Sequence, residues 1–350
     1  MRAETLALLK CPHCGSELRC AERGEVISGT VDCTSCRKTY PVLAGVLILV
    51  ADVESYLLEH VKGISRYVGE KDIPKKYRAD FIEAKRELEA EHIEEDLEAE
   101  RVTALYIMTH YLRSSEVKST SPLLDGLIKQ HWDHGPFAKI KEMITALSGE
   151  KRSMIELGCG VGGLFVALQS KLQSYLGLDS SFASIVLARH FALGAPLSKQ
   201  CLIPNDLLFG AVSREITIAP PKSMPSNADF IVCDLANPPV KEAQWQVAAA
   251  LNVIDMLPEP AELPKLQYAL LSSGGVAIQS CPYIWHPEVA EKLRRVLPKN
   301  IKDSAKAVEW LYEKNGFKIR SSEEHVPWLF YKNNRQIEFY SVHLFSGFKV

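Results

Sequence analysis

The stretch Met154–Gly163, MIELGCGVGG, decides the fold together with Tyr175–Asp179, YLGLD, which follows after one helix length. Each segment contains an apolar run and an acidic residue, and glycines separate the first run from the helix-forming sequence behind it. Glycine lacks a Cβ, so the chain can turn sharply against a ligand at the carboxyl end of a parallel strand. The next helix offers unpaired N–H groups at the same place. This pattern predicts a pocket for a nucleotide-type cofactor.

The glycine spacing alone leaves the identity of that cofactor open. Gly158, Gly160 and Gly163 form G-x-G-x-x-G, and Asp179 follows about 20 residues later, as in the dinucleotide fingerprint whose acid binds a ribose hydroxyl. Glu156 favours a different ligand, because a carboxylate two residues before the first glycine is placed to meet an ammonium group. Nicotinamide cofactors carry no ammonium, whereas S-adenosylmethionine (SAM) does. The sequence therefore favours SAM.

Further apolar runs predict the rest of a parallel sheet. Ile231–Asp234, Trp245–Leu251 and Gly275–Ser280 are expected to be its third, fourth and fifth strands, and they alternate with helix-forming sequence. Phe317–Ile319 and the alternating stretch Arg335–Leu344 would add two more strands. In such a sheet the binding site lies beyond the carboxyl ends of the strands.

The segment ELGCGVGG resembles motif I of class I SAM-dependent methyltransferases, and LGLDSS resembles their next motif. The resemblance implies an α/β, Rossmann-like fold with a seven-stranded sheet whose last two strands form an antiparallel hairpin. It also implies that Asp179 holds the ribose hydroxyls, while Asp234 accepts a hydrogen bond from the adenine amino group. The expected cofactor-binding residues are Glu156, Gly158, Cys159, Gly160, Asp179, Ser180, Asp234, Leu235 and Leu251.

Three later segments resemble the methyltransferase domain of the ovothiol-synthesis family, which methylates an imidazole nitrogen of 5-mercaptohistidine. They are Asn252–Pro260 (NVIDMLPEP), Ser280–Trp285 (SCPYIW) and Val326–Phe330 (VPWLF), with Arg335 close behind. The resemblance implies methylation of a small nitrogen- or sulfur-containing metabolite, such as a histidine derivative. In-line methyl transfer requires mainly alignment of the acceptor and exclusion of water.

Candidate residues for the acceptor wall lie beyond the fourth and fifth strands and in the terminal hairpin. Arg335 is expected to hold a substrate carboxylate. The expected catalytic or acceptor-binding residues are Asn252, Asp255, Tyr283, His286 and Arg335, with Trp285 beside them.

Four cysteines near the N-terminus have the spacing C-x2-C-x18-C-x2-C, which falls in the zinc-ribbon range. Cys11, Cys14, Cys33 and Cys36 would complete a closed tetrahedral Zn²⁺ site without an open position for catalysis. A segment this short has too small a core to fold alone, so metal binding would supply its folding free energy. Cys20 is expected to lie outside the site.

The stretch Leu9–Leu49 resembles the small zinc domain of the methyltransferase-activator family, whose members bind methyltransferases as separate subunits. The resemblance implies that the ribbon is a scaffold or a substrate-docking module within the same chain. The expected domains are a zinc ribbon at 1–53, a helical linker or cap at 54–149 and a methyltransferase domain at 150–350. A long helix is predicted over Asp80–Leu105, because this run has strong helix formers and no glycine or proline.

The segment Gln130–Gly135, QHWDHG, places aromatic and titratable side chains just before the first core strand. His131 or Trp132 could contribute a lid over the cofactor, although plain helix packing is the competing interpretation. A metal site from His131, Asp133 and His134 is disfavoured, because their spacing does not put three ligands on one helix face.

Composition narrows the alternatives. The chain has 350 residues and a formal charge of −2, which gives no global attraction to nucleic-acid phosphates. Nine cysteines, four of them assigned to zinc, suggest a reducing compartment, and cytoplasmic location without membrane contact is expected. Two other functions stay open: methylation of a protein or RNA docked by the ribbon, and a non-catalytic SAM-binding scaffold.

Overall fold

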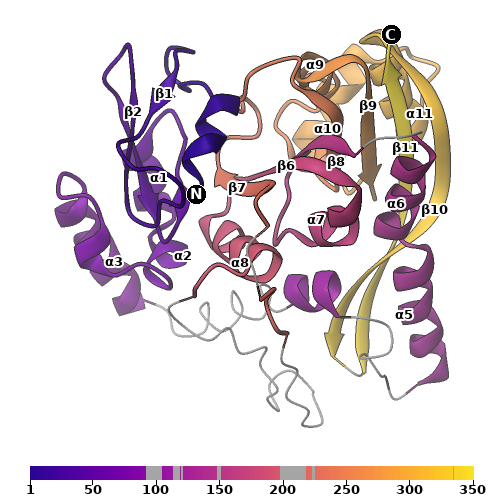
Figure 1. The fold of residues 1–350 in the computed structure, drawn as a ribbon. Helices are drawn as coiled ribbons and strands as arrows, with labels where there is room; N and C mark the ends of the chain where they lie inside the picture. The colour runs from indigo at the N-terminus through magenta and orange to yellow at the C-terminus, as the bar shows by residue number, and fades with distance from the viewer. Residues whose placement is uncertain are drawn as a thin grey trace.

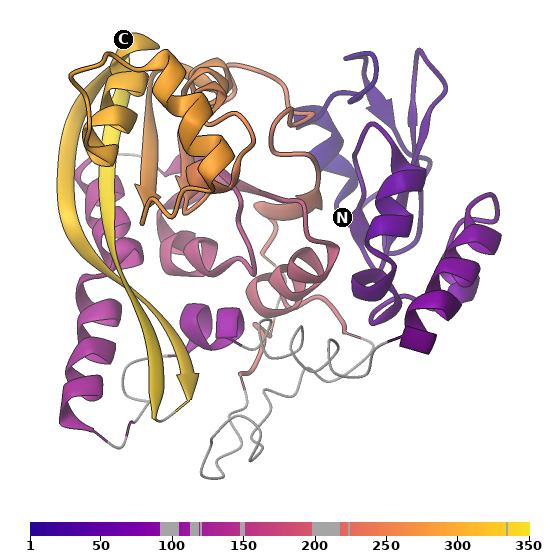
Figure 2. The ribbon, with the colours of Figure 1, turned by 180° about the vertical axis from the view of Figure 1, so that it is seen from behind.

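The computed structural model of this chain describes residues 1–91, 105–112, 119, 121–147, 151–197, 218–222, 225–333 and 335–350. Within these residues a large sheet with helices around it stands beside a small N-terminal sheet (Figure 1). The view from behind shows the long C-terminal hairpin at the far edge from the N-terminal sheet (Figure 2). The hairpin and the N-terminal sheet therefore lie at opposite ends of the molecule.

The large sheet has seven strands in the order β10-β11-β9-β8-β5-β6-β7. Strands β5 to β9 are parallel to one another, while β11 is antiparallel to both β9 and β10. This arrangement confirms the predicted class I methyltransferase-like α/β fold. The strands are β5 (Arg152–Leu157), β6 (Leu172–Asp179), β7 (Ala228–Val232), β8 (Trp245–Leu251), β9 (Leu271–Cys281), β10 (Phe317–Asn333) and β11 (Gln336–Lys349).

The order of the strands along the chain reverses at β5, which has β6 on one side and β8 on the other. Such a switch point leaves a crevice beyond the carboxyl ends of the strands, because the connections on either side leave in opposite directions. All five residues of β7 and six of the seven in β8 are buried. The apolar runs in the sequence mark these strands because both faces of a parallel sheet are covered.

The helices that cover this sheet include α8, which packs on β6 and β7, and α9, which packs on β8 and β9. The Ser181 side chain caps α8 by accepting the N–H of Ser184, and Gly194 ends it with a φ of +77°. Residues 105–111 are also helical. The other helices are α5 (Pro122–His134), α6 (Pro136–Ala146), α7 (Gly163–Leu168), α8 (Phe182–Leu193), α9 (Glu262–Leu270), α10 (Pro287–Val296) and α11 (Ser304–Lys314), with short 3-10 turns η3 (Gln169–Lys171) and η5 (Ile254–Met256).

The terminal hairpin is much longer than the sequence predicts. Polar residues such as those of Ser321–His325 interrupt its apolar alternation, and shifts in register occur between Ile319 and Ser321 and between Glu323 and Val326. Such irregularities break the period-two signal without ending the strand.

The N-terminal part forms a four-stranded antiparallel sheet in the order β1-β2-β3-β4. The predicted long helix begins at Arg78 and is described to Glu91, while its expected remainder to Leu105 lies largely outside the described residues. The elements are η1 (Ala3–Leu8), β1 (Leu18–Arg19), β2 (Gly29–Cys33), β3 (Thr39–Leu43), β4 (Val46–Leu47), α1 (Val53–Glu59), α2 (Val61–Ser65), η2 (Glu70–Asp72) and α3 (Arg78–Glu91).

This small sheet is fixed to the edge strand β7. The Leu49 N–H donates to the Val232 carbonyl over 2.9 Å, and Ile48 forms a parallel bridge with Val232. Apolar side chains of both parts belong to one continuous core. The N-terminal sheet thereby covers an edge that would otherwise expose unpaired backbone groups.

A buried ion-pair network joins the two parts. The Arg189 guanidinium on α8, 1% exposed, contacts the carboxylates of Asp229 in β7 and Glu25 in the N-terminal part. Asp229 also accepts the Arg2 N–H at 2.7 Å and the Thr5 hydroxyl at 2.8 Å. Removing one partner of such a group leaves a charge buried without compensation.

We therefore expect Asp229→Ala to lower the free energy of unfolding by about 3–5 kcal/mol, because Arg189 would lose its main partner while it stays buried. Urea denaturation followed by circular dichroism measures this. Arg294→Ala, which removes an exposed pair with Glu291, is the matched control and should change nothing measurable. A loss below 1 kcal/mol in Asp229→Ala would contradict the importance of the network.

Candidate active site

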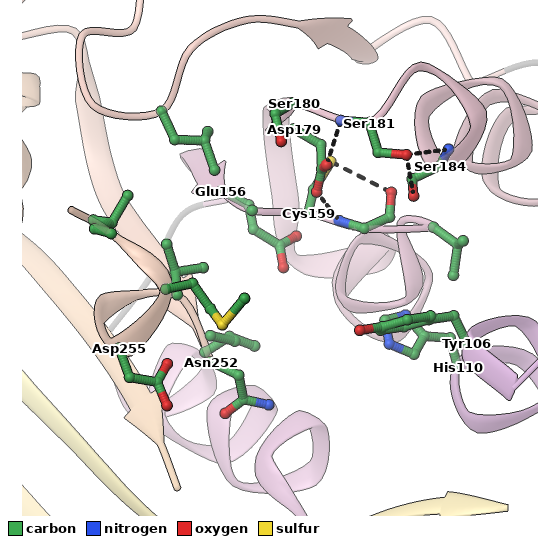
Figure 3. A pocket seen from close by; sticks show the side chains of 18 of the residues that line it. Tyr106, His110, Glu156, Cys159, Asp179, Ser180, Ser181, Ser184, Asn252 and Asp255 are labelled. Carbon is green, nitrogen blue, oxygen red and sulfur yellow. Dashed lines mark hydrogen bonds between the residues drawn. The ribbon is translucent and has the colours of Figure 1, made fainter. Parts of the chain in front are cut away.

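A cavity of about 1300 Å³ opens at the carboxyl ends of the parallel strands (Figure 3). It exceeds the range of roughly 300–1,000 Å³ that is common for single small-molecule sites, so it has room for two ligands side by side. Residues from β5, β6 and β8, and from the loops after β7 and β9, line it. This is the position at which the switch point of the sheet predicts a site.

The glycine turn after β5 brings backbone directly against this cavity. A Cβ on Gly158 would lie 2.4 Å from Val253 Cγ2, and the residue has a φ of +75°, so no larger side chain fits. The Gly160 N–H donates to Asp179 Oδ2 over 2.9 Å, and the Ser181 N–H donates to Asp179 Oδ1 over 2.8 Å. Asp179 thus fixes the glycine turn and the start of α8, while its carboxylate lines the cavity.

Glu156 lies below the glycine turn and is only 3% exposed. Burial raises the pKa of its carboxyl group to about 8, and the nearby Asp179 adds to the effect, while the Tyr175 hydroxyl donates a hydrogen bond to it and opposes it. A carboxylate this poorly solvated gains stability from a cation placed beside it. The position therefore suits a positively charged ligand group.

The remaining expected cofactor-binding positions surround the same space. Asp234 is exposed just beyond β7, and its Oδ1 accepts the Ala236 N–H over 2.9 Å, which orders the loop. The Tyr56 hydroxyl donates to the Ser180 carbonyl over 2.6 Å and so fixes α1 to this wall. Every expected cofactor-binding residue lines the cavity: Glu156, Gly158, Cys159, Gly160, Asp179, Ser180, Asp234, Leu235 and Leu251.

Two of the expected acceptor residues also line the cavity. Asn252 has a φ of +56°, and its side-chain oxygen accepts the Ser280 hydroxyl over 3.3 Å. Asp255 is 5% exposed and accepts the Ile284 N–H over 2.8 Å. Asp255 therefore holds the loop after β9 in place besides contributing to the wall.

The other expected acceptor residues do not reach the cavity. Tyr283 has a φ of +60°, and its hydroxyl lies 2.7 Å from His343 Nδ1 on β11, while Pro282 and Ile284 line the cavity in its place. Trp285 stacks on Tyr283 and donates its indole N–H to Ser304. The left-handed backbone at Tyr283 turns both rings toward the hairpin.

His286 and Arg335 also lie away from the cavity lining. His286 is exposed and precedes the first residue of α10, and Arg335 is exposed in the turn between β10 and β11. The sequence places both near the ends of sheet strands, yet the length of the hairpin carries Arg335 to its distal tip. A carboxylate-binding role of Arg335 inside this cavity therefore has no support from its position.

The expected lid from Gln130–Gly135 is replaced by another segment. His131, 7% exposed, uses Nδ1 to accept the Leu329 N–H over 3.2 Å, and Trp132 donates its indole N–H to the Leu112 carbonyl. Both side chains serve packing and do not line the cavity. Tyr106 and His110, from the helical residues before Leu112, line it instead (Figure 3).

Sequence reasoning missed an aromatic wall on this side of the cavity. Its members come from segments far apart in sequence, and single aromatic residues carry no spacing signal that distinguishes them from core. Of its members, only Trp328 and Phe330 lie in a segment that the sequence marks, Val326–Phe330 (VPWLF). The wall consists of Tyr106, His110, Phe137, Trp328, Phe330 and Tyr340. The sequence also gave no sign that Lys62, Arg66, Ser181 and Ser184 would line the cavity.

The four N-terminal cysteines converge as their spacing predicts. Their Sγ atoms all lie within 4.8 Å of one another, with 3.7 Å between Cys11 and Cys36 and 3.4 Å between Cys14 and Cys33. A tetrahedral site with metal–sulfur bonds near 2.3 Å has sulfur–sulfur edges of about 3.8 Å. The cluster therefore has the dimensions of a four-thiolate metal site, and Cys20 is not part of it.

Comparison with solved structures finds methyltransferases at low similarity. A chain of the complex between the Haloferax volcanii Trm112 methyltransferase activator and a methyltransferase is 13% identical, with 64% of this chain and 92% of that chain covered and a TM-score of 0.40. Magnesium protoporphyrin IX methyltransferase from Synechocystis with bound S-adenosylhomocysteine is 15% identical, with 68% and 92% covered and a TM-score of 0.41. At these scores no residue role is carried over to this chain.

No protein-family model and no curated protein matches this chain. Among the described residues no helix combines the length and apolar character that crossing a bilayer requires.

The raised pKa of Glu156 predicts how stability depends on pH in the ligand-free protein. The folded chain keeps this proton up to about pH 8, whereas an ordinary glutamate releases it near pH 4.5. The contribution of Glu156 to stability therefore falls as pH rises through this window, by up to about 1.4 kcal/mol per pH unit. Glu156→Gln should become progressively more stable than the parent between pH 5 and pH 8, as urea titrations measure. If the unfolding free energies of the parent and of Glu156→Gln depended on pH in the same way, the raised pKa of Glu156 would be contradicted.

Proposed function

We propose that this chain is a SAM-dependent methyltransferase. The observation that carries the proposal is the meeting of Glu156, Asp179 and Asp234 around the glycine turn in one cavity. SAM supplies an electrophilic methyl group on a sulfonium, and its charged and polar groups match this order of side chains. Glu156 suits an ammonium, Asp179 suits a ribose diol and Asp234 suits an adenine amino group.

The residues present fit this cofactor physically. The buried Glu156 carboxyl is raised in pKa and would be stabilised by a ligand cation, which a nicotinamide dinucleotide does not provide. Gly158 and Gly160 leave room for close backbone approach. Leu235 and Leu251 supply apolar surface of the kind that covers a flat base.

We infer that the acceptor is a small molecule. Aromatic rings and the loop at Asn252 line the part of the cavity beyond Glu156, which suits alignment of a small acceptor. Because Arg335 lies in the turn at the hairpin tip, the expected salt bridge to the carboxylate of a histidine derivative has no support.

The alternative of a protein or RNA docked by the ribbon is less well supported. The cavity lining begins at Lys62, so no residue of the N-terminal sheet faces it. That sheet is occupied by its contacts with β7, through Leu49 and the Arg189 network. A non-catalytic scaffold is also disfavoured, because such a protein has no need of a cavity with room beyond the cofactor.

We further propose that Cys11, Cys14, Cys33 and Cys36 bind one structural Zn²⁺. The Sγ atoms of all four lie within 4.8 Å of one another, as the ligands of one metal ion require. Four sulfur ligands leave no open coordination position, so the metal would hold the ribbon together and take no part in methyl transfer.

Methyl-labelled SAM tests the enzymatic proposal. Incubation of the protein with cell extract should put label into the small-molecule fraction. Asp179→Ala should lose the transfer and weaken S-adenosylhomocysteine binding at least tenfold by calorimetry, because Asp179 would bind the ribose and orders the glycine turn. Glu242→Gln, outside the cavity, is the control. Label confined to protein or RNA would favour the docking alternative, and normal binding by Asp179→Ala would refute the cofactor assignment.

Zinc binding has its own test. Plasma mass spectrometry of the purified protein should give one zinc per chain, and Cys36→Ser should lose the metal and unfold at lower temperature. Cys20→Ser is the matched control and should keep both properties, because Cys20 lies outside the cluster. A parent protein that contains no zinc and unfolds at the same temperature with and without added zinc would exclude a structural zinc.

A further inference from the structure

We propose that the acceptor half of the cavity binds a neutral, planar N-heteroaromatic ring and that the imidazole of His110 orients this ring through a hydrogen bond to its N–H. The inference rests on the proposed methyltransferase function and specifies the class of its acceptor. It also assigns a substrate-contacting role to a residue that no sequence motif marks.

The placement of His110 is the first support. Its ring lies on the glycine turn, since a Cβ on Gly163 would be 2.7 Å from His110 Nδ1 and one on Gly160 would be 3.9 Å from Cε1. Figure 3 shows it across the cavity from Asn252 and Asp255. An acceptor between these walls would lie beside the cofactor space at Glu156.

The helical segment that carries His110 is held firmly in place. The Tyr111 hydroxyl donates to the Val161 carbonyl in the glycine turn, and the Tyr331 N–H contacts the Thr109 hydroxyl over 3.4 Å. The position of His110 is thereby fixed from both the glycine turn and the hairpin, as a group that orients a substrate requires.

The hydrogen-bonding state of His110 is the second support. Nδ1 is buried without a partner, and no hydrogen bond to either ring nitrogen is found within the described parts of the chain. With Nδ1 turned to Gly163, Nε2 is the nitrogen available at the cavity surface. Burial lowers the pKa of this imidazole to about 3, with a further contribution from His131, so it is neutral near pH 7. We assign the proton to Nδ1, so that Nε2 accepts the hydrogen bond from the N–H of the ligand.

The aromatic wall explains why the ligand should be flat. The rings of Tyr106, Phe137 and Trp328 meet the His110 ring nearly edge-on, with centroids 6.1, 5.3 and 5.9 Å away. Phe330 packs edge-on against Tyr106 with centroids 5.1 Å apart. Such rings favour contacts with the face or edge of another aromatic ring.

The charges around the cavity argue against a negatively charged ligand, and a ring nitrogen must also be unprotonated to accept a methyl group. Among the described lining residues the only cations are Lys62 and Arg66. Both belong to the α2 region, which packs on the start of α8 through Gly63 and Ala183 and so lies on the ribose side near Asp179. A carboxylate on the acceptor would meet aromatic rings and Asp255, and burying an unpaired charge there is unfavourable.

The chemistry of such an acceptor balances without a strong base. A ring nitrogen forms the N–CH₃ bond with its lone pair while the S–CH₃ bond breaks and sulfur keeps the bonding electrons. Positive charge moves onto the ring, whose aromatic neighbours stabilise it by cation–π attraction. The proton on the second ring nitrogen stays hydrogen-bonded to His110 and leaves to solvent from the product.

Binding of two matched probes tests the inference without relying on turnover. Benzimidazole carries the ring N–H, and 1-methylbenzimidazole lacks it. The full-length protein saturated with S-adenosylhomocysteine should bind benzimidazole about three- to tenfold more tightly, the value of one neutral hydrogen bond. His110→Phe keeps an aromatic ring and should make the two affinities equal. Calorimetry and tryptophan fluorescence measure both.

His131→Phe is the control, because His131 is a second buried imidazole beside Trp328 that does not line the cavity. It should preserve the preference for benzimidazole. Failure of the parent protein to bind either probe, equal affinities in the parent, or an unchanged preference in His110→Phe would each overturn the inference. Tighter binding of benzimidazole-5-carboxylate than of benzimidazole would overturn the neutral-ligand part. The titration is repeated without S-adenosylhomocysteine. Probe affinities that do not depend on this compound would point to failure of the cofactor assignment, separately from the outcomes above.

Discussion

The rest of the structure depends on the close approach of other segments to glycines around the cofactor space. A Cβ on Gly177 of β6 would lie 2.4 Å from the Phe230 ring of β7, and one on Gly158 would lie 2.4 Å from Val253 after β8. The same constraint at Gly163 admits the ring of His110. Side chains from three segments therefore occupy space that the glycines leave free. A larger residue at any of these positions would push apart the groups that form the site.

The N-terminal sheet acts on this arrangement through two routes. Its pairing with β7 stabilises the strand that carries Phe230 and ends before Asp234, and Arg189 ties it to α8. The chain then continues into α1, where the Tyr56 hydroxyl donates to the carbonyl of Ser180, the residue after Asp179. The ribbon and the cavity are therefore mechanically continuous, although no ribbon residue lines the cavity. This connection gives a physical reason to fuse the small N-terminal sheet to such a fold.

The sequence predicts the strands well, and the residues expected to bind the cofactor lie together in one cavity, because both depend on local patterns. Buried parallel strands appear as apolar runs, and the acids follow those runs at fixed short spacing. The acceptor half is different, since Tyr106, Phe137 and Tyr340 meet only through tertiary packing. Tyr283 lies outside the cavity for a related reason. Its backbone follows β9 as expected, but its left-handed conformation directs the side chain to His343. A single sequence does not reveal such a local reversal.

The two halves of the cavity differ in electrostatic character, and the proposed methyl transfer would make use of that difference. Glu156, Asp179 and Asp234 surround the space proposed for the cationic cofactor, whereas the opposite wall is aromatic and its histidine is neutral. When a methyl group leaves a sulfonium, positive charge crosses from the acidic half to the aromatic half. Aromatic faces stabilise a cation without attracting a proton, so the acceptor keeps its lone pair until it reacts.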